Sequence, residues 1–99
     1  MKIRIQSINF DATVQLEAYI DKKMLKLEKN FDKIETIDVY LKVVKPESAT
    51  NKEAEIKVSA PGIEFFASKV CDTFEEAVDL CVDALDKQVR KHKEKQNKK

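Results

Sequence analysis

The sequence predicts an α+β fold: a single two-layer domain with the order β-α-β-β-β-α, in which two helices cover one face of a four-stranded sheet. Three observations predict this fold. The chain has 99 residues, which suits one domain with one modest core. Two long segments repeat apolar residues at helical steps of three and four. Four shorter segments alternate apolar and polar residues, as half-buried strands do.

The first two predicted elements are a strand and a helix. Lys2 to Ile8 is predicted as a strand, because Ile3 and Ile5 fall on one face of the alternation. Asp11 is the predicted N-cap of a helix that runs to about Phe31. The apolar stripe that should face the core consists of Leu16, Ile20, Met24, Leu27 and Phe31.

Three strands are predicted next. Pro61 and Gly62 are the residues that a type II turn favours, so the strands at Ala54–Ala60 and Ile63–Val70 should form a hairpin. A right-handed crossover through the first helix should place the first strand parallel to the second. In that second strand, from Ile34, the predicted inward positions are Ile37, Val39, Leu41 and Val43, and the outward ones are Asp38, Tyr40 and Lys42.

A second helix closes the predicted domain. Asp72 is its predicted N-cap, with Glu75 at the third helical position as in a capping box. We predict that residues 1–95 form the domain and that residues 96–99 are a basic, disordered tail. The predicted core face of this helix contains Phe74, Val78, Cys81, Leu85 and Val89.

The composition excludes several classes of protein. Cys71 and Cys81 are ten residues apart without a CxxC motif, so we expect buried thiols in a reducing cytoplasm rather than a disulfide or zinc site. The N-terminus alternates charge with isoleucine and lacks the apolar stretch of a signal peptide. No segment has the apolar length, about 20 residues, that spans a membrane. The predicted location is cytoplasmic.

Positive charge is concentrated near the C-terminus. The segment Lys87–Lys99 holds seven lysines or arginines and one acid, Glu94. The rest of the chain holds twelve basic and seventeen acidic residues, and the formal net charge of the whole chain is +1. Positive charge that gathers on a helix end is an electrostatic signature of phosphate binding.

Basic residues also form rows on both predicted helices. The lysines of the first helix fall within about 60° of arc, and two such rows on one side of a sheet can merge into one positive groove. A groove of this kind attracts a polyanion, for which RNA or DNA is the expected class. The first row is Lys22, Lys26, Lys29 and Lys33, with Lys23 beside it, and the second is Lys87, Lys91, Lys95 and Lys98, flanked by Arg90 and Lys93.

Few aromatic residues are available for stacking on bases. Tyr40, on the outward face of a strand, is the best candidate, whereas Tyr19 and Phe66 are equally explained by packing. Lysines position a protein on a phosphate backbone and read little sequence. We therefore expect a protein that fits folded RNA by shape and charge, rather than one that stacks successive bases.

No constellation of residues predicts catalysis. His92, the single histidine, is in phase with the core face of the second helix, so we expect it to pack or to touch phosphate. Asp79, Asp83 and Asp86 lack the further ligands of a metal site and are expected to form a solvated face. The P-loop, GxGxxG and HExxH motifs are absent. We predict no enzyme, no metal and no cofactor.

Two segments resemble a known family. They read KKMLKLEKNFDKIETIDVYLKV, from Lys22 to Val43, and DKQVRKHKEK, from Asp86 to Lys95. They are similar to the ribosome hibernation-promoting factor family, also called ribosome-associated inhibitor A or sigma-54 modulation protein. The matching element order covers essentially the whole chain. The resemblance implies a β-α-β-β-β-α fold like that of double-stranded-RNA-binding domains.

The same resemblance implies a function and a site. It implies binding to the small ribosomal subunit between head and body, where the protein overlaps the mRNA path and the A- and P-site tRNA positions. It also implies silencing of translation in stress or stationary phase, without a small-molecule substrate or a membrane. The RNA-facing positions that the resemblance implies are Lys22, Lys23, Lys26, Lys29, Lys87, Arg90, Lys91, Lys93 and Lys95.

Two features differ from the family pattern. Pro61-Gly62 stands where some relatives have Gly-Gly, which changes the turn but not the mechanism. The chain stops at Lys99, so it resembles the short form without a C-terminal dimerisation domain, and we expect a monomer off the ribosome. The resemblance leaves open whether the protein helps to pair ribosomes or only occludes single ribosomes.

Two other functions remain as alternatives. The first is a general double-stranded-RNA-binding module with no preference for ribosomes. The second is a protein-interaction module that uses the exposed sheet face or the acidic segment Glu75–Asp86.

Overall fold

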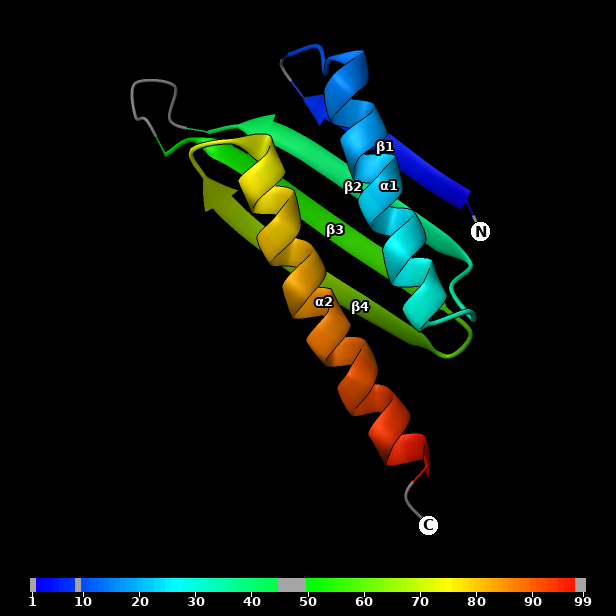
Figure 1. Ribbon diagram of the computed structural model, residues 1–99. Coiled ribbons are helices and arrows are strands. Elements are labelled where there is room, and N and C mark those ends of the chain that lie inside the picture. The colour runs from blue at the N-terminus through cyan, green and yellow to red at the C-terminus, as the bar shows by residue number, and fades with distance from the viewer. Residues whose placement is uncertain (1, 9, 45–49, 98–99) are drawn as a thin grey trace.

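The computed structural model has the element order that the sequence predicts, and the α+β fold is confirmed (Figure 1). It describes the backbone of residues 2–8, 10–44 and 50–97, and the side chains in these ranges up to residue 94. The elements are β1 (Lys2–Ile8), α1 (Val14–Asn30), β2 (Thr36–Val43), β3 (Lys52–Ala60), β4 (Ile63–Cys71) and α2 (Phe74–Asn97).

The strands form one sheet with the order β1-β2-β3-β4. β1 pairs in parallel with β2, as predicted, and Ile3 lies opposite Ile37. The β2–β3 and β3–β4 pairs are antiparallel. Gly62 has a φ of 76°, the positive value that the second central residue of a type II turn requires, so the predicted hairpin is confirmed.

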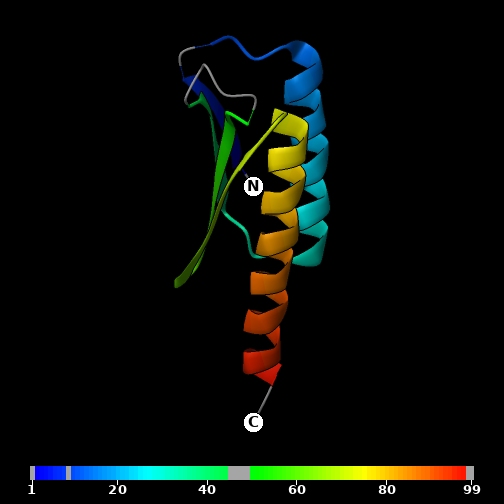
Figure 2. The ribbon, with the colours of Figure 1, turned by 90° about the vertical axis from the view of Figure 1, so that its left-hand side faces the viewer.

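Both helices lie on the same face of the sheet and run in the same direction (Figures 1 and 2). The core lies between the helices and the sheet, where Ile20, Met24 and Leu85 have no accessible surface. Complete burial of one aliphatic side chain stabilises a fold by about 1.5–3 kcal/mol. The predicted apolar stripes are therefore confirmed, and they fix which side chains of each helix face solvent.

The two helices begin later than predicted, because threonines rather than aspartates cap them. Thr13 Oγ1 accepts a hydrogen bond from the backbone N–H of Leu16 at 3.0 Å. Thr73 Oγ1 accepts one from the N–H of Glu76 at 3.1 Å. In both segments the residue directly before the first helical residue provides the cap. The side chain of Asp72 instead accepts a hydrogen bond from the hydroxyl of Thr50 at 2.6 Å.

The C-terminal part of α2 extends past the end of α1 and past the sheet (Figures 1 and 2). Residues 96 and 97 of the predicted tail belong to this helix, while residues 98 and 99 lie outside the described residues. The disorder of the tail stays a prediction.

A side-chain amide on α2 contacts the edge strand β4. Gln88 Nε2 donates to the backbone carbonyl of Phe66 at 2.9 Å, and Gln88 Oε1 accepts from the Phe66 N–H at 3.4 Å. Edge strands carry unpaired peptide groups that can pair with another strand. Gln88 satisfies two such groups, the N–H and the C=O of Phe66, and fastens α2 to the sheet.

Candidate nucleic-acid interface

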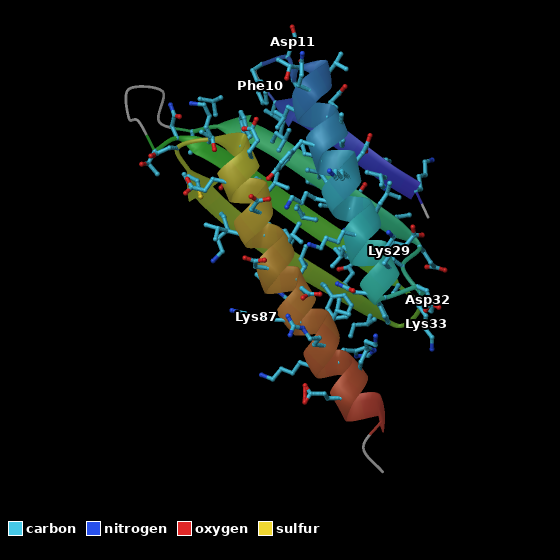
Figure 3. All side chains as sticks on the ribbon, viewed as in Figure 1. Phe10, Asp11, Lys29, Asp32, Lys33 and Lys87 are labelled. Atoms are coloured by element: carbon cyan, nitrogen blue, oxygen red, sulfur yellow. The ribbon has the colours of Figure 1, made fainter. Side chains whose placement is uncertain are left out.

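The exposed side of α1 carries a row of three lysines. Lys22, Lys26 and Lys29 are exposed and, with Lys23 and other residues of α1, line a hollow of ≈ 840 Å³. The predicted fourth member, Lys33, is not on the helix, because α1 ends at Asn30 and Lys33 lies in the turn that follows (Figure 3). The row is therefore shorter than predicted.

The basic residues of α2 lie on two sides of that helix. Lys93 faces α1, because its Nζ donates to the backbone carbonyl of Asn30, and Arg90 lies on the Asp86 side of α2, where it pairs with that acid. Lys87 points away from α1 in Figure 3. Lys91 lies beside β4, where it lines a small hollow with Phe65 and other residues. The backbone of residue 95 belongs to α2, but the side chain of Lys95 lies outside the described residues.

Asp79, in the second turn of α2, joins this helix to the middle of α1. Its Oδ1 accepts a hydrogen bond from the Tyr19 hydroxyl at 2.7 Å and forms a salt bridge with Lys23 Nζ at 3.2 Å. The ammonium of Lys23 also lies 5.4 Å from the centroid of the Tyr19 ring. The hydrogen bond to Asp79, together with its charge, raises the pKa of Lys23. Lys23 is thus held in a contact between helices.

A second contact joins the helices at the end of α1. Asp86 accepts hydrogen bonds from Asn30 Nδ2 at 2.8 Å and from Arg90 Nη2 at 2.7 Å. Lys93 Nζ donates to the backbone carbonyl of Asn30 at 2.9 Å. The Arg90 side chain is still 69% exposed, so its other N–H donors face solvent.

The predicted basic residues therefore have two kinds of environment. Lys23, Arg90 and Lys93 contact the neighbouring helix or an acid, and Asp79 and Asp86 lie between the two basic rows. The surface is thus a polar seam flanked by lysines rather than one uniformly positive groove. Within the described part of the chain, the exposed cations without a hydrogen bond or salt bridge on these helices are Lys22, Lys26, Lys29, Lys87 and Lys91.

The opposite, open face of the sheet is balanced in charge. Strand alternation from the pairing register places four basic and four acidic residues there: Lys2, Arg4, Lys42 and Lys57, and Asp38, Glu53, Glu55 and Glu64. Asp38 is predicted to point outward and does lie on this face, yet it is only 7% exposed. The reason is Arg4, whose Nε donates to Asp38 Oδ1 at 2.6 Å.

Sequence reasoning missed the role of the acids on α2. Asp79 and Asp86 are expected to be solvated, but both are half-buried and accept hydrogen bonds from α1. Their spacing on one side of α2 was the available signal. It could not reveal their partners, which lie more than fifty residues earlier in the chain.

The single histidine and the two thiols have packing roles. The His92 ring lies against Phe31 and Phe65, with centroid distances of 5.9 and 5.7 Å. Cys71 and Cys81 are buried free thiols, as predicted, and burial raises the pKa of Cys81 to about 12. A protonated thiol is a poor nucleophile.

No metal centre or membrane span is found in the described part of the chain. Over residues 2–8, 10–44 and 50–97, no three His, Cys, Asp or Glu residues gather to hold a metal ion. Of the helices described there, neither is long and apolar enough to cross a membrane.

Residues 3–97 match the model of the sigma 54 modulation protein / S30EA ribosomal protein family. The chain belongs to this family. The match spans both helices and all four strands, and the resemblance predicted from two segments is confirmed.

Two relatives in this family are similar over most of their length. The ribosome hibernation promoting factor of Azotobacter vinelandii is 36% identical over 96 residues, which cover 97% of this chain and 86% of the relative. The protein of the same name from Pseudomonas putida is 33% identical, with 97% and 90% covered. A ribosomal subunit interface protein from Coxiella burnetii has the same fold, with a TM-score of 0.83, 24% identity and coverage of 94% and 98%.

Proposed function

We propose that this protein is a ribosome hibernation factor that docks on RNA of the small ribosomal subunit through the solvent side of α1 and α2. Docking there would block the mRNA and tRNA sites and silence translation. Membership of the family, with relatives named ribosome hibernation promoting factor, supports the ribosome as partner. The five exposed lysines that have no partner among the described side chains of α1 and α2 are the observation that carries the choice of surface.

The chemistry of these lysines suits phosphate. Each ammonium that neutralises a phosphate releases counterions, which makes the association strong and dependent on salt. The open sheet face is a poorer candidate, because its four carboxylates offset its four cations, whereas residues 22–30 of α1 and 87–97 of α2 hold nine basic and two acidic residues. Tyr40 lies on that face beside Glu53 and Glu55, whose charge repels phosphate. We therefore infer recognition of folded RNA by charge and shape.

Silencing by this route needs no covalent step. A protein that occupies the mRNA and tRNA sites competes by mass action and leaves when its concentration falls. We infer that the protein acts in the cytoplasm as a monomer and catalyses no reaction. Gln88, which occupies the N–H and the C=O of Phe66 on the edge strand β4, supports the monomeric state.

Charge reversal on the helices tests the proposed surface. The variant with Lys26→Glu and Lys91→Glu should no longer sediment with small subunits, because two attractive charges become repulsive. The control is Lys2→Glu with Lys42→Glu, which makes the same change in net charge on the opposite face. It should sediment like the wild type. If the helix variant still sediments with small subunits, the proposed surface is wrong.

A further inference from the structure

Asp86 is an acid within a basic surface, and both of its carboxylate oxygens have partners. Oδ1 accepts from Asn30, the last residue of α1, and Oδ2 accepts from Arg90, one turn further along α2. The Asp86 side chain is 24% exposed. One half-buried carboxylate therefore connects the end of α1 to the basic part of α2.

Asn30 is held by a second contact. Lys93 Nζ donates to its backbone carbonyl, which is among those that lack an intrahelical partner at a helix end. Asn30 is thus bound through its side chain and its main chain by residues seven positions apart on α2. Together these contacts fix the distance between the turns that carry Lys26 and Lys29 and the turn that carries Arg90.

We propose that Asp86 is a positioning residue for phosphate binding, an inference that rests on the proposed function. The charge of Asp86 repels phosphate and, alone, weakens the association. Its hydrogen bonds have the opposite effect, because they hold Arg90 and the end of α1 at one spacing. Phosphates on folded RNA also have a fixed spacing, so cations that are already held lose less conformational entropy on binding.

Asp83 provides a matched control on the same helix. It lies one turn before Asp86, is exposed, and has no hydrogen bond or salt bridge within the described residues. Asp83→Ala and Asp86→Ala each remove one negative charge from α2. If charge alone mattered, both variants would bind small subunits more tightly than the wild type.

The test measures the affinity of the three proteins for purified small subunits over a range of salt concentrations. Asp83→Ala should tighten binding about twofold, because one weakly screened repulsion is removed. Asp86→Ala should weaken binding about tenfold, since Arg90 and the end of α1 would then lose conformational freedom on binding. The salt dependence should become less steep only in Asp86→Ala, because Arg90 no longer reaches its phosphate in a fixed position.

A rescue variant separates positioning from general destabilisation. Asp86→Glu keeps the carboxylate, so it should bind small subunits more tightly than Asp86→Ala. In an Asn30→Ala background, Asp86→Ala should lower the affinity by a smaller factor than it does in the wild type, because one partner of Asp86 is already absent. Circular dichroism at the assay temperature checks that each variant is folded. If Asp86→Ala binds as tightly as Asp83→Ala, the positioning role is wrong.

The same assay distinguishes failure of this inference from failure of the proposed function. If the wild type does not bind small subunits, or if Lys26→Glu with Lys91→Glu binds normally, the proposed function or its surface fails. If both behave as proposed but Asp86→Ala binds more tightly than the wild type, only the role of Asp86 fails.

Discussion

Lys22 and Lys23 are neighbours in the sequence, but their ammonium groups have different surroundings. Lys22 is exposed, whereas Lys23 forms a salt bridge with Asp79 and lies over the Tyr19 ring. The helical period predicts that both face outward from the core. It cannot predict which one meets Asp79, because that depends on the distance and rotation between two helices. The sequence therefore predicts which lysines lie on the solvent side of the helix, but not which of them forms a salt bridge.

Cys81 gives a prediction at this scale. Its thiol is buried, donates to the backbone carbonyl of Ala54 at 3.4 Å, and has a pKa of about 12 because burial disfavours the thiolate. At pH 8 the Cys81 thiol is therefore protonated in the folded protein. In the variant Cys71→Ser, which leaves Cys81 alone, labelling by a thiol reagent should be very slow.

Mass spectrometry of the labelled protein measures this rate. The counterpart Cys81→Ser leaves Cys71, which is also buried, at 8% exposure. In denaturant both single-cysteine variants should react at the same rate, which controls for the reagent. Rapid labelling of Cys81 in folded protein would contradict its burial as a protonated thiol.

The elements follow from period and turn chemistry, while their ends depend on packing. The apolar alternation predicts β2, and Gly62 predicts the hairpin between β3 and β4. The helix starts are less certain from sequence, because aspartate and threonine both cap helices and stand close together in each segment. The Phe10 ring stacks on Phe74 at 4.7 Å, so tertiary contact joins the two helix starts, and sequence cannot predict that contact.

The caps can be tested by substitution. Thr13→Ala and Thr73→Ala should each lower the free energy of unfolding by about 1 kcal/mol, because each removes the acceptor for a backbone N–H in the first turn. Asp11→Ala, two residues before the cap of α1, should change it by much less. Urea denaturation monitored by circular dichroism measures these differences. An equal loss in Asp11→Ala and Thr13→Ala would mean that Asp11 shares the capping role.

At the scale of the whole molecule, charge is arranged differently on the two faces. On the helix face the positive charge is concentrated in the C-terminal parts of the helices, where residues 22–30 and 87–97 hold nine basic and two acidic residues, while the open sheet face has four residues of each sign. The sequence predicts this separation, because strand alternation and helical phase assign each residue to a face. It does not predict the polar seam around Asp79 and Asp86, because the partners of these acids depend on how the two helices pack together. The formal net charge of +1 conceals both features.

Salt dependence is the prediction that belongs to this scale. If Arg90 and the five unpaired lysines of the described residues each neutralise one phosphate, the logarithm of the association constant should fall with the logarithm of salt concentration with a slope of about −5. Lys26→Ala should make this slope less steep by about one. Lys42→Ala, on the sheet face, should leave it unchanged. Equilibrium binding to small subunits measures the slope, and an equal change in both variants would argue against a localised surface.

The shared direction of α1 and α2 has a further consequence for stability. The C-terminal end of a helix has the equivalent of about half a negative charge, which cations nearby stabilise. Lys29 lies in the last turn of α1, and Lys93 donates to the final carbonyl of that helix. Clusters of like charge usually lower the stability of a fold. Here the partial negative charge at the end of α1 offsets part of the repulsion between the lysines. The lysines are therefore partly stabilised even when no phosphate is bound.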